Sequence, residues 1–173
     1  MPKGAPVSFS LPEAAWAMCF SESAVSVLNR KAQRWCRSES VGQLFTADLA
    51  KPTIVIDVAT VLKPLRSSWA SVTFDAAEAM RQREERFRQG LYCIGLWHTH
   101  PEPAPDPSGT DERLAADHAQ AAVSVLNALA FVIVGTRAFP DGWYVGFHDG
   151  RNFHRAVSIN SISFPWDSAL KAK

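Results

Sequence analysis

The stretch Leu91–Asp111, LYCIGLWHTHPEPAPDPSGTD, carries more information about the fold than any other part of the chain. Its apolar beginning, up to Trp97, follows a glycine and is typical of a buried strand. Side chains two positions apart on a strand point to the same face, so His98 and His100 are expected to face one way. Four prolines between positions 101 and 107 then remove amide donors and predict a loop.

A helix is expected to open at Asp111, where the carboxylate can turn back toward both histidines. Two imidazoles and a carboxylate are ligands that zinc accepts, and a catalytic zinc site leaves its fourth position to water. The sequence therefore predicts that His98, His100 and Asp111 hold one zinc ion per chain. A plainer interpretation applies to part of the motif, because Ser108-Gly109-Thr110-Asp111 also fits the capping box that begins many helices.

Taken together, these residues resemble the signature of the JAMM (MPN+) zinc metalloproteases. In this chain the signature reads His98-Thr99-His100-Pro101, six residues, Ser108, two residues and Asp111. The resemblance covers about Val7 to Ala156 in the order of elements. It implies a curved mixed sheet flanked by helices, the cytidine-deaminase-like α/β fold, with zinc held by the two histidines and the aspartate. It also implies that Ser108 polarises the scissile carbonyl group or steadies the oxyanion.

The family also uses an upstream glutamate, which activates the zinc-bound water. That glutamate lies at the start of a strand and is closely followed by glycine and an apolar run, a pattern that Glu39-Ser40-Val41-Gly42-Gln43-Leu44-Phe45 resembles. The resemblance therefore implies that Glu39 is this residue, while the usual second glycine beside Gly42 is absent. Glu13 and Glu22 are rival candidates, but neither precedes such a strand.

The expected reaction explains these residue types. Zinc lowers the pKa of a bound water toward about 7 and stabilises negative charge on oxygen. Glu39 would take a proton from that water and deliver it to the leaving amine. Ser108 would donate a hydrogen bond to the developing oxyanion. The expected outcome is hydrolysis of a peptide or isopeptide bond.

Interleaved helices and strands predict one α/β domain over residues 7–166, with a flexible arm over residues 1–6 and a flexible tail over residues 167–173. Strand patterns lie at residues 7–11, 39–46, 53–62, 67–74, 91–100 and 131–135, and residues 142–147 and 153–159 are expected to form a terminal hairpin. Helices are expected from Ser21 or Ser23 to about Cys36, from Asp75 to near Gly90, and from Asp111 to Leu129.

The composition narrows the class of protein. A formal charge of +1 gives no sign of nucleic-acid binding, and 47% hydrophobic residues fit a globular domain. No apolar run approaches the roughly 20 residues of a membrane helix, and Pro12 and Glu13 interrupt any signal-like core. Cys19, Cys36 and Cys93 form no C-x-x-C pair, so we expect no disulfide framework, no cysteine zinc site, and a reducing, cytoplasmic setting.

Several other residues carry weaker signals. His118 is expected to face solvent or to neighbour the site rather than to bind zinc as a fourth ligand. His148 and His154 are expected to be exposed near the hairpin turn. Charged helix faces are usually solvated, and we expect the same of the face formed by Arg81–Arg86. Docking of a modifier on this face is the alternative. Three residues are expected to pack in the interior: Met80, Cys93 and Trp97.

The resemblance implies a ubiquitin-like modifier as substrate, with its C-terminal tail added as a strand beside the sheet. The short chain is most similar to bacterial stand-alone members that occur beside E1- and E2-like enzymes in anti-phage defence operons, where they remove or mature a modifier. Maturation of a sulfur-carrier protein, cleavage of a small-molecule amide, and a non-enzymatic MPN scaffold remain alternatives. A deaminase is disfavoured because its P-C-x-x-C ligands are missing.

Overall fold

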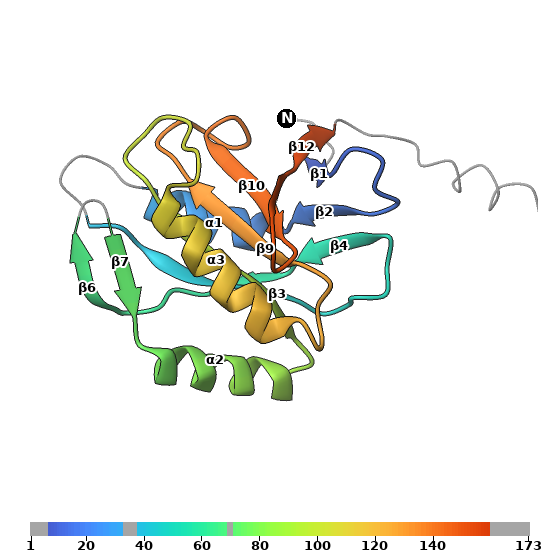
Figure 1. Ribbon diagram of the computed structural model, residues 1–173, viewed down its shortest axis with the longest axis horizontal. Helices are drawn as coiled ribbons and strands as arrows, with labels where there is room; N and C mark the ends of the chain where they lie inside the picture. The colour runs from blue at the N-terminus through green and yellow to red at the C-terminus, as the bar shows by residue number, and fades with distance from the viewer. Residues whose placement is uncertain (1–6, 33–37, 69–70, 160–173) are drawn as a thin grey trace, which may run out of the picture.

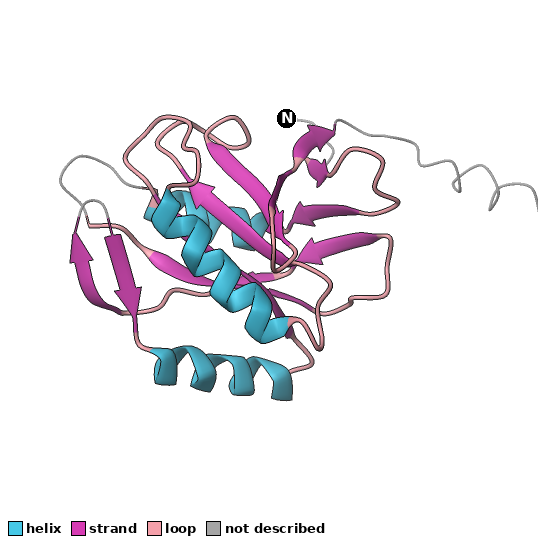
Figure 2. Cartoon of the chain, viewed as in Figure 1, coloured by secondary structure: helices cyan, strands magenta, loops and turns pink. Residues whose placement is uncertain are grey.

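The structure is a computed structural model that describes residues 7–32, 38–68 and 71–159. It contains a six-stranded sheet and a four-stranded sheet, accompanied by helices and a short separate hairpin (Figures 1 and 2). The expected α/β class with a mixed sheet flanked by helices is confirmed. The arm over residues 1–6 and the tail over residues 167–173 lie outside the described residues. The first helix, Glu22–Lys31, ends before the expected boundary near Cys36, because Ala32 adopts a non-helical conformation with ψ 131°.

The central sheet positions the candidate site. Its strand order is β11-β10-β9-β8-β3-β5. Strands β8 and β9 are parallel, whereas the other neighbouring pairs are antiparallel. A parallel pair needs a long crossover, and α3 (Gly109–Ala122) lies within it. The strands span Val41–Thr46 (β3), Val58–Ala59 (β5), Tyr92–Thr99 (β8), Leu129–Val134 (β9), Trp143–His148 (β10) and Phe153–Arg155 (β11).

The second sheet has the order β12-β1-β2-β4, with β2 and β4 parallel. Its strands span Ser8–Ser10 (β1), Ala17–Phe20 (β2), Thr53–Ile56 (β4) and Val157–Ile159 (β12). Helix α1 (Glu22–Lys31) follows β2, and the hairpin of β6 (Pro64–Ser68) and β7 (Ser71–Phe74) leads into α2 (Ala76–Arg88). Among the described residues, no helix is both long and apolar enough to cross a membrane.

Both faces of the central sheet are covered by apolar packing. Val132 and Val134 of β9 belong to the large cluster that also contains residues of the second sheet and α1. Phe131 and Ile133 belong to a second cluster with Ala115 of α3. Side chains of a strand alternate between faces, so this arrangement explains why β9 is apolar throughout, as the sequence LAFVIV shows.

The expected starts of α1 and α2 are confirmed by capping contacts, whereas α3 begins at Gly109, two residues before the expected Asp111. The Ser21 hydroxyl accepts a hydrogen bond from the Ala24 amide at 3.1 Å, and the Asp75 carboxylate accepts one from the Ala77 amide at 2.8 Å. Gly90 follows the end of α2 with φ 78°, a left-handed conformation that favours glycine.

The expected single strand over residues 53–62 is wrong. The chain instead forms β4 in the second sheet and β5 in the central sheet, with Asp57 between them. The Asp57 amide donates to the Phe45 carbonyl at 2.9 Å, and its carboxylate accepts from the Ala47 amide at 2.8 Å. This polar residue therefore marks the point where the chain passes from one sheet to the other.

Other elements also differ from expectation, and the expected strand over residues 67–74 is instead the hairpin of β6 and β7. Helix α3 ends at Ala122 instead of Leu129, because Leu129 begins β9 and packs in the cluster beneath the helix. The last expected strand is divided, since residues after Ala156 pair with β1 whereas those before it pair with β10. Strand β2 was not expected, because four residues are too short to show a clear period.

Gly42 of β3 is expected to resist substitution. A Cβ atom at this position would overlap the Thr60 carbonyl oxygen and approach Trp97 Nε1 to 2.5 Å, and these two groups hydrogen-bond each other at 2.8 Å. We expect Gly42→Ala to lower the free energy of unfolding by about 1–3 kcal/mol, the scale of overpacking. Urea unfolding provides the measurement, and Gly109→Ala, on an exposed helix start, should cost little. Equal stability of both variants would contradict this packing.

Candidate metal centre

Strand pairing positions the two histidines. His98 lies opposite Val41 of β3 and opposite Ile133 of β9. One residue beyond the strand, the His100 amide donates to the Val134 carbonyl at 2.9 Å. The ring of His98 packs against Phe131, with centroids 5.3 Å apart, and only 3% of the residue is exposed. The two imidazoles are therefore held by the backbone of the central sheet on one face, as the strand period predicts.

The capping box at the start of α3 is present and holds Asp111. The Ser108 amide and the Ser108 hydroxyl each donate to Asp111 Oδ2 at 2.7 Å, and the Asp111 amide donates to Ser108 Oγ at 3.3 Å. The two interpretations of this motif are therefore compatible in structure. The bonds that cap the helix also direct the carboxylate toward the histidines.

The proline-rich loop brings α3 back over the sheet. The Glu102 carbonyl accepts from the Thr136 amide at 2.9 Å, and the Pro103 carbonyl accepts from the Arg137 amide at 3.1 Å. A Cβ atom at Gly135 would lie 2.6 Å from the Glu102 carbonyl oxygen, so the absence of a side chain permits this close approach. The loop is thus attached to the chain that follows β9.

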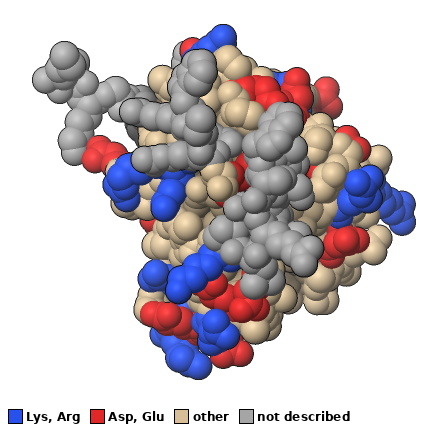
Figure 3. Space-filling model, turned by 90° about the vertical axis from the view of Figure 1, so that its left-hand side faces the viewer, with Lys and Arg blue, Asp and Glu red and all other residues tan. Residues whose placement is uncertain are grey.

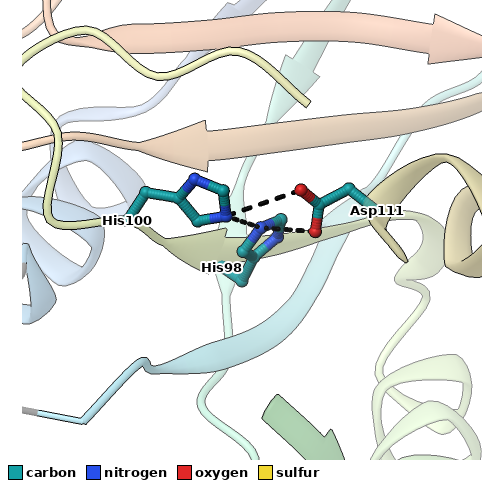
Figure 4. Close-up of side chains that lie close together, drawn as sticks. All are labelled: His98, His100 and Asp111. Carbon is teal, nitrogen blue, oxygen red and sulfur yellow. Dashed lines mark hydrogen bonds and ion pairs between the residues drawn. The ribbon is translucent and has the colours of Figure 1, made fainter. Parts of the chain in front are cut away.

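The side chains of His98, His100 and Asp111 converge (Figure 4). The two Nε2 atoms are 3.0 Å apart, and Asp111 Oδ1 lies 3.0 Å from His98 Nε2. Asp111 Oδ2 lies 3.5 Å from His100 Nε2. Zinc bonds of 2.0–2.1 Å in a tetrahedron would separate ligand atoms by about 3.3 Å. The three side chains therefore fit a zinc ion in both ligand type and spacing.

Local electrostatics favours the ligand forms of two members of this cluster. Burial alone would raise the pKa of Asp111, but the hydrogen bond and charge of His98 and the bonds from Ser108 outweigh it and lower the pKa to about 2. Burial, followed by the charge of His98, lowers the pKa of His100. An anionic carboxylate and a neutral imidazole are the protonation states that coordinate a metal.

Glu39 lies beside this cluster. It precedes β3 by two residues, so the expected strand start is two residues too early, but the Thr99 amide still donates to the Ser40 carbonyl at 3.0 Å. Continuing the register from the Val41–His98 pair places Glu39 opposite His100 and on the same face. Only 5% of Glu39 is exposed.

The surroundings of Glu39 suit proton transfer near neutral pH. Burial, together with the negative charges of Asp111 and Glu102, raises the pKa of Glu39 from 4.5 to about 7. A carboxyl group with such a pKa both accepts and releases a proton readily at pH 7. The rival residues lie elsewhere in the fold: Glu13 has a φ of 63° before β2, Glu22 begins α1, and both are exposed.

Some of the weaker expectations are confirmed and others are wrong. Trp97 is fully buried as expected. Met80 is 52% exposed, because it lies on the outer face of α2. His148 is 4% exposed rather than solvent-facing, since the hairpin turn covers it and the Gly150 amide donates to its Nδ1 atom at 3.0 Å. His154 is half-buried and pairs with Asp149 at 2.7 Å.

His118 and the charged face of α2 do not extend the cluster. The half-buried ring of His118 stacks on Phe74 at 5.7 Å, and the metal-ligand group found among the described residues contains His98, His100 and Asp111 alone. Among the described side chains visible in Figure 3, Lys and Arg are interspersed with Asp and Glu.

Sequence reasoning missed two polar neighbours of the cluster. Glu102 Oε2 lies 3.4 Å from His100 Nδ1, the ring nitrogen that does not face the other ligands. Thr99, between the two histidines, is fully buried. Their positions directly within and after the His-Thr-His-Pro motif were the available signal, but their contacts depend on the folded chain.

Comparison with known proteins identifies the family. The model of a family described as prokaryotic homologs of the JAB domain matches residues 21–145. The CD-NTase/cGAS isopeptidase of Enterobacter hormaechei subsp. hoffmannii (strain UCI 50) is 28% identical over 109 residues, which make up 62% of this chain and 61% of that protein. The match thus spans about three fifths of the length of this curated relative.

Solved structures extend the comparison to the fold. A protein from Desulfitobacterium hafniense, known from its solution structure, aligns with a TM-score of 0.59 at 17% identity, over 79% of this chain and 87% of its own. A JAB1/MPN domain protein from Archaeoglobus fulgidus aligns with a TM-score of 0.43 at 16% identity, over 83% of this chain and 95% of its own. The match to the family model covers more than half of the chain, and we conclude that this protein belongs to the prokaryotic JAB (JAB/MPN) domain family, as its His-Thr-His-Pro and Ser-x-x-Asp motifs indicate.

Proposed function

We propose that this protein is a zinc-dependent isopeptidase that hydrolyses the bond following the C-terminal tail of a ubiquitin-like modifier. The observation that carries the proposal is the convergence of His98, His100 and Asp111 beside a buried glutamate whose pKa is close to 7. Each part of a metal-assisted hydrolysis is thus represented by a side chain of suitable type. The catalytic roles of Glu39 and Ser108 are part of the proposal.

His98, His100 and Asp111 would hold the zinc ion through two imidazole nitrogens and a carboxylate oxygen. When bound, zinc would lower the pKa of a coordinated water toward about 7 and polarise the scissile carbonyl group. Glu102 lies on the far side of His100, where its carboxylate can accept the Nδ1 hydrogen and leave Nε2 free to coordinate. The site is therefore supported beyond its three ligands.

Glu39 would transfer the proton. In its ionised form the carboxylate accepts a proton from the attacking water, and in its protonated form it delivers that proton to the nitrogen of the leaving amine. The pKa of about 7 allows both forms to be reached at neutral pH. The position of Glu39 and its pKa therefore both support the proposed role of this residue in proton transfer.

Ser108 would stabilise the oxygen of the scissile carbonyl as negative charge develops. Its hydroxyl hydrogen points to Asp111 Oδ2 in this structure, while its amide makes a second bond to the same oxygen. The amide can thus hold the aspartate while the hydroxyl rotates toward a substrate. One donor of this kind contributes about two to three orders of magnitude to turnover.

The proposed reaction belongs to a bacterial ubiquitin-like conjugation pathway linked to anti-phage defence. The relative from Enterobacter hormaechei is named as an isopeptidase of CD-NTase/cGAS, which supports a conjugated protein as the substrate. Enzymes like E1 and E2 would be partners in the same pathway, and the reaction would take place in the cytoplasm. Deconjugation and maturation of a modifier precursor both break a bond after the same tail.

A direct test uses a bacterial ubiquitin-like protein joined by its terminal carboxyl group to a lysine of a carrier peptide. Zinc-loaded protein should release the carrier, with mass spectrometry locating the cut directly after the modifier. Cleavage of a sulfur-carrier precursor instead would favour the maturation alternative. Equal cleavage of unfolded casein would indicate a general peptidase, and no cleavage of any of these would support a scaffold.

The metal prediction follows from the ligand geometry. The purified protein should carry about one zinc ion per chain, and His98→Ala/His100→Ala should remove it. His118→Ala is the matched control, because this half-buried histidine lies outside the cluster and should leave the zinc content unchanged. Metal analysis by mass spectrometry decides, and zinc retained by the double variant would contradict the site.

Glu39→Gln should keep zinc and lower kcat by about two orders of magnitude or more, the scale of losing an acid–base group. The amide preserves the shape of the side chain but removes its basic oxygen. Glu13→Gln, at an exposed position, should retain normal turnover. Near-normal turnover of Glu39→Gln would exclude this residue as the base, and Glu22→Gln would then be measured.

The same variant should change how stability depends on pH in the metal-free protein. Because folding raises the pKa of Glu39 from 4.5 to about 7, its protonated form favours the native state below pH 4.5, and this contribution is lost as the pH rises through about 7. Glu39→Gln should therefore raise Tm relative to the parent protein more at pH 8 than at pH 4.5. A difference in Tm that is independent of pH would show that the carboxyl group is not destabilised by its surroundings.

Ser108→Ala separates capping from catalysis. Loss of the cap should cost about 1 kcal/mol of stability, and loss of the hydroxyl donor should lower turnover by roughly two to three orders of magnitude with zinc retained. Ser21→Ala removes the equivalent cap of α1 and should lower stability alone. Thermal melting and turnover are measured together, and a Ser108→Ala variant that behaves like Ser21→Ala would restrict Ser108 to capping.

A further inference from the structure

We propose that the hydroxyl group of Thr99 is a positioning group, which holds Glu39 opposite His100 by accepting the amide hydrogen of Ser40. The inference rests on the proposed role of Glu39 in proton transfer. It concerns a residue that binds neither metal nor substrate, and it assigns a function to the residue between the two histidines.

The pairing of β3 with β8 shows why this bond matters. Val41 lies opposite His98 in the last pair of the regular ladder. One step further, the Thr99 amide donates to the Ser40 carbonyl at 3.0 Å. The Ser40 amide, however, donates to Thr99 Oγ1 at 2.9 Å. A side-chain hydroxyl thus accepts the bond that a backbone carbonyl accepts in a regular antiparallel pair.

This bond extends the pairing of β3 and β8 by one residue to Ser40, which directly follows Glu39 in the chain. With Ser40 held opposite Thr99, the next pair in register is Glu39 with His100, and side chains of opposite residues share a face. Thr99 is one residue away from each histidine, so its side chain points to the other face of the sheet. Its complete burial agrees with that direction. The hydroxyl therefore acts on Glu39 through the backbone of Ser40.

Glu39 lies in surroundings that disfavour its ionised form. The carboxyl group is buried, and the negative charges of Asp111 and Glu102 oppose its ionised form. Like charges at short range tend to separate when the backbone allows it. The two hydrogen bonds between Ser40 and Thr99 oppose that movement. Removing the hydroxyl would leave the half-buried Ser40 amide without this acceptor.

The test compares three variants of buried threonines. Thr99→Val keeps the shape and loses the hydroxyl, whereas Thr99→Ser keeps the hydroxyl. Thr46→Val is the matched control, because Thr46 lies at the other end of the same strand pair, opposite Tyr92, and is 1% exposed. Zinc content, Tm, kcat and KM are measured with the modifier joined to a lysine of the carrier peptide.

We expect Thr99→Val to retain about one zinc ion per chain and to lower kcat by about 10- to 100-fold, the scale of a misplaced catalytic group, with KM changed by less than about twofold. Thr99→Ser should recover most of the lost kcat. Thr46→Val, which loses its hydrogen bonds to the Asp48 backbone, should keep the kcat and zinc content of the parent protein. Unchanged kcat in Thr99→Val, or the same loss in Thr46→Val, would overturn the proposal.

A double variant tests whether Thr99 acts through Glu39. If it does, Thr99→Val/Glu39→Gln should be no slower than Glu39→Gln, because the group to be positioned is already inactive. A purely structural defect would multiply the two losses. Multiplied losses would therefore assign Thr99 to general stability and reject the positioning role.

Hydrogen exchange gives a measurement that does not need activity. The Ser40 amide should exchange at least about tenfold faster in Thr99→Val than in the parent protein or Thr46→Val, and Thr99→Ser should restore its protection. Unchanged exchange would overturn the proposal whatever the kinetics. A parent protein that cleaves no conjugate would instead refute the proposed isopeptidase function, so the two failures are distinguishable.

Discussion

The antiparallel register between β3 and β8 is the constraint on which the candidate site depends. The pair Val41–His98 orients both histidines to one face and, by continuation, brings Glu39 opposite His100. A shift of one residue would reverse every side chain of β8 and direct Trp97 toward the site. The Trp97 indole hydrogen-bonds the Thr60 carbonyl, and Gly42 leaves room for this contact. The interior packing on one face therefore determines the position of the polar groups on the other.

The same atoms at the start of α3 cap the helix and form part of the candidate metal centre. The Ser108–Asp111 capping box holds the helix, and it also stabilises the ionised form of the Asp111 carboxylate. Glu39 experiences the opposite effect, since burial and neighbouring negative charge raise its pKa to about 7. The pKa values of two carboxyl groups in one site are thus shifted in opposite directions. The low pKa of Asp111 suits a metal ligand, and the raised pKa of Glu39 suits a group that carries a proton.

Elements with strong local patterns were predictable from the sequence, and elements defined by distant pairing were not. The buried strand β8, the capped helices α1 and α2 and the start of α3 follow from hydrophobic period and capping residues. The division of residues 53–62 at Asp57 was not predictable, because a β-branched run has the same pattern whether it enters one sheet or two. Strands β2 and β12 contain four and three residues, and they are stabilised by partners far away in the sequence.

The sequence by itself determined the candidate ligand set, because a strand period puts His98 and His100 on one face and a capping box directs Asp111 to the start of a helix. It also indicated Glu39 by resemblance. Tertiary structure alone decided that Glu39 lies near Asp111 and Glu102, that Ser40 bonds to Thr99 across 59 positions of sequence, and that Glu102 reaches the outer nitrogen of His100. The physical reason is that local spacing determines the face on which a side chain lies, whereas the register between distant strands depends on how the whole interior packs.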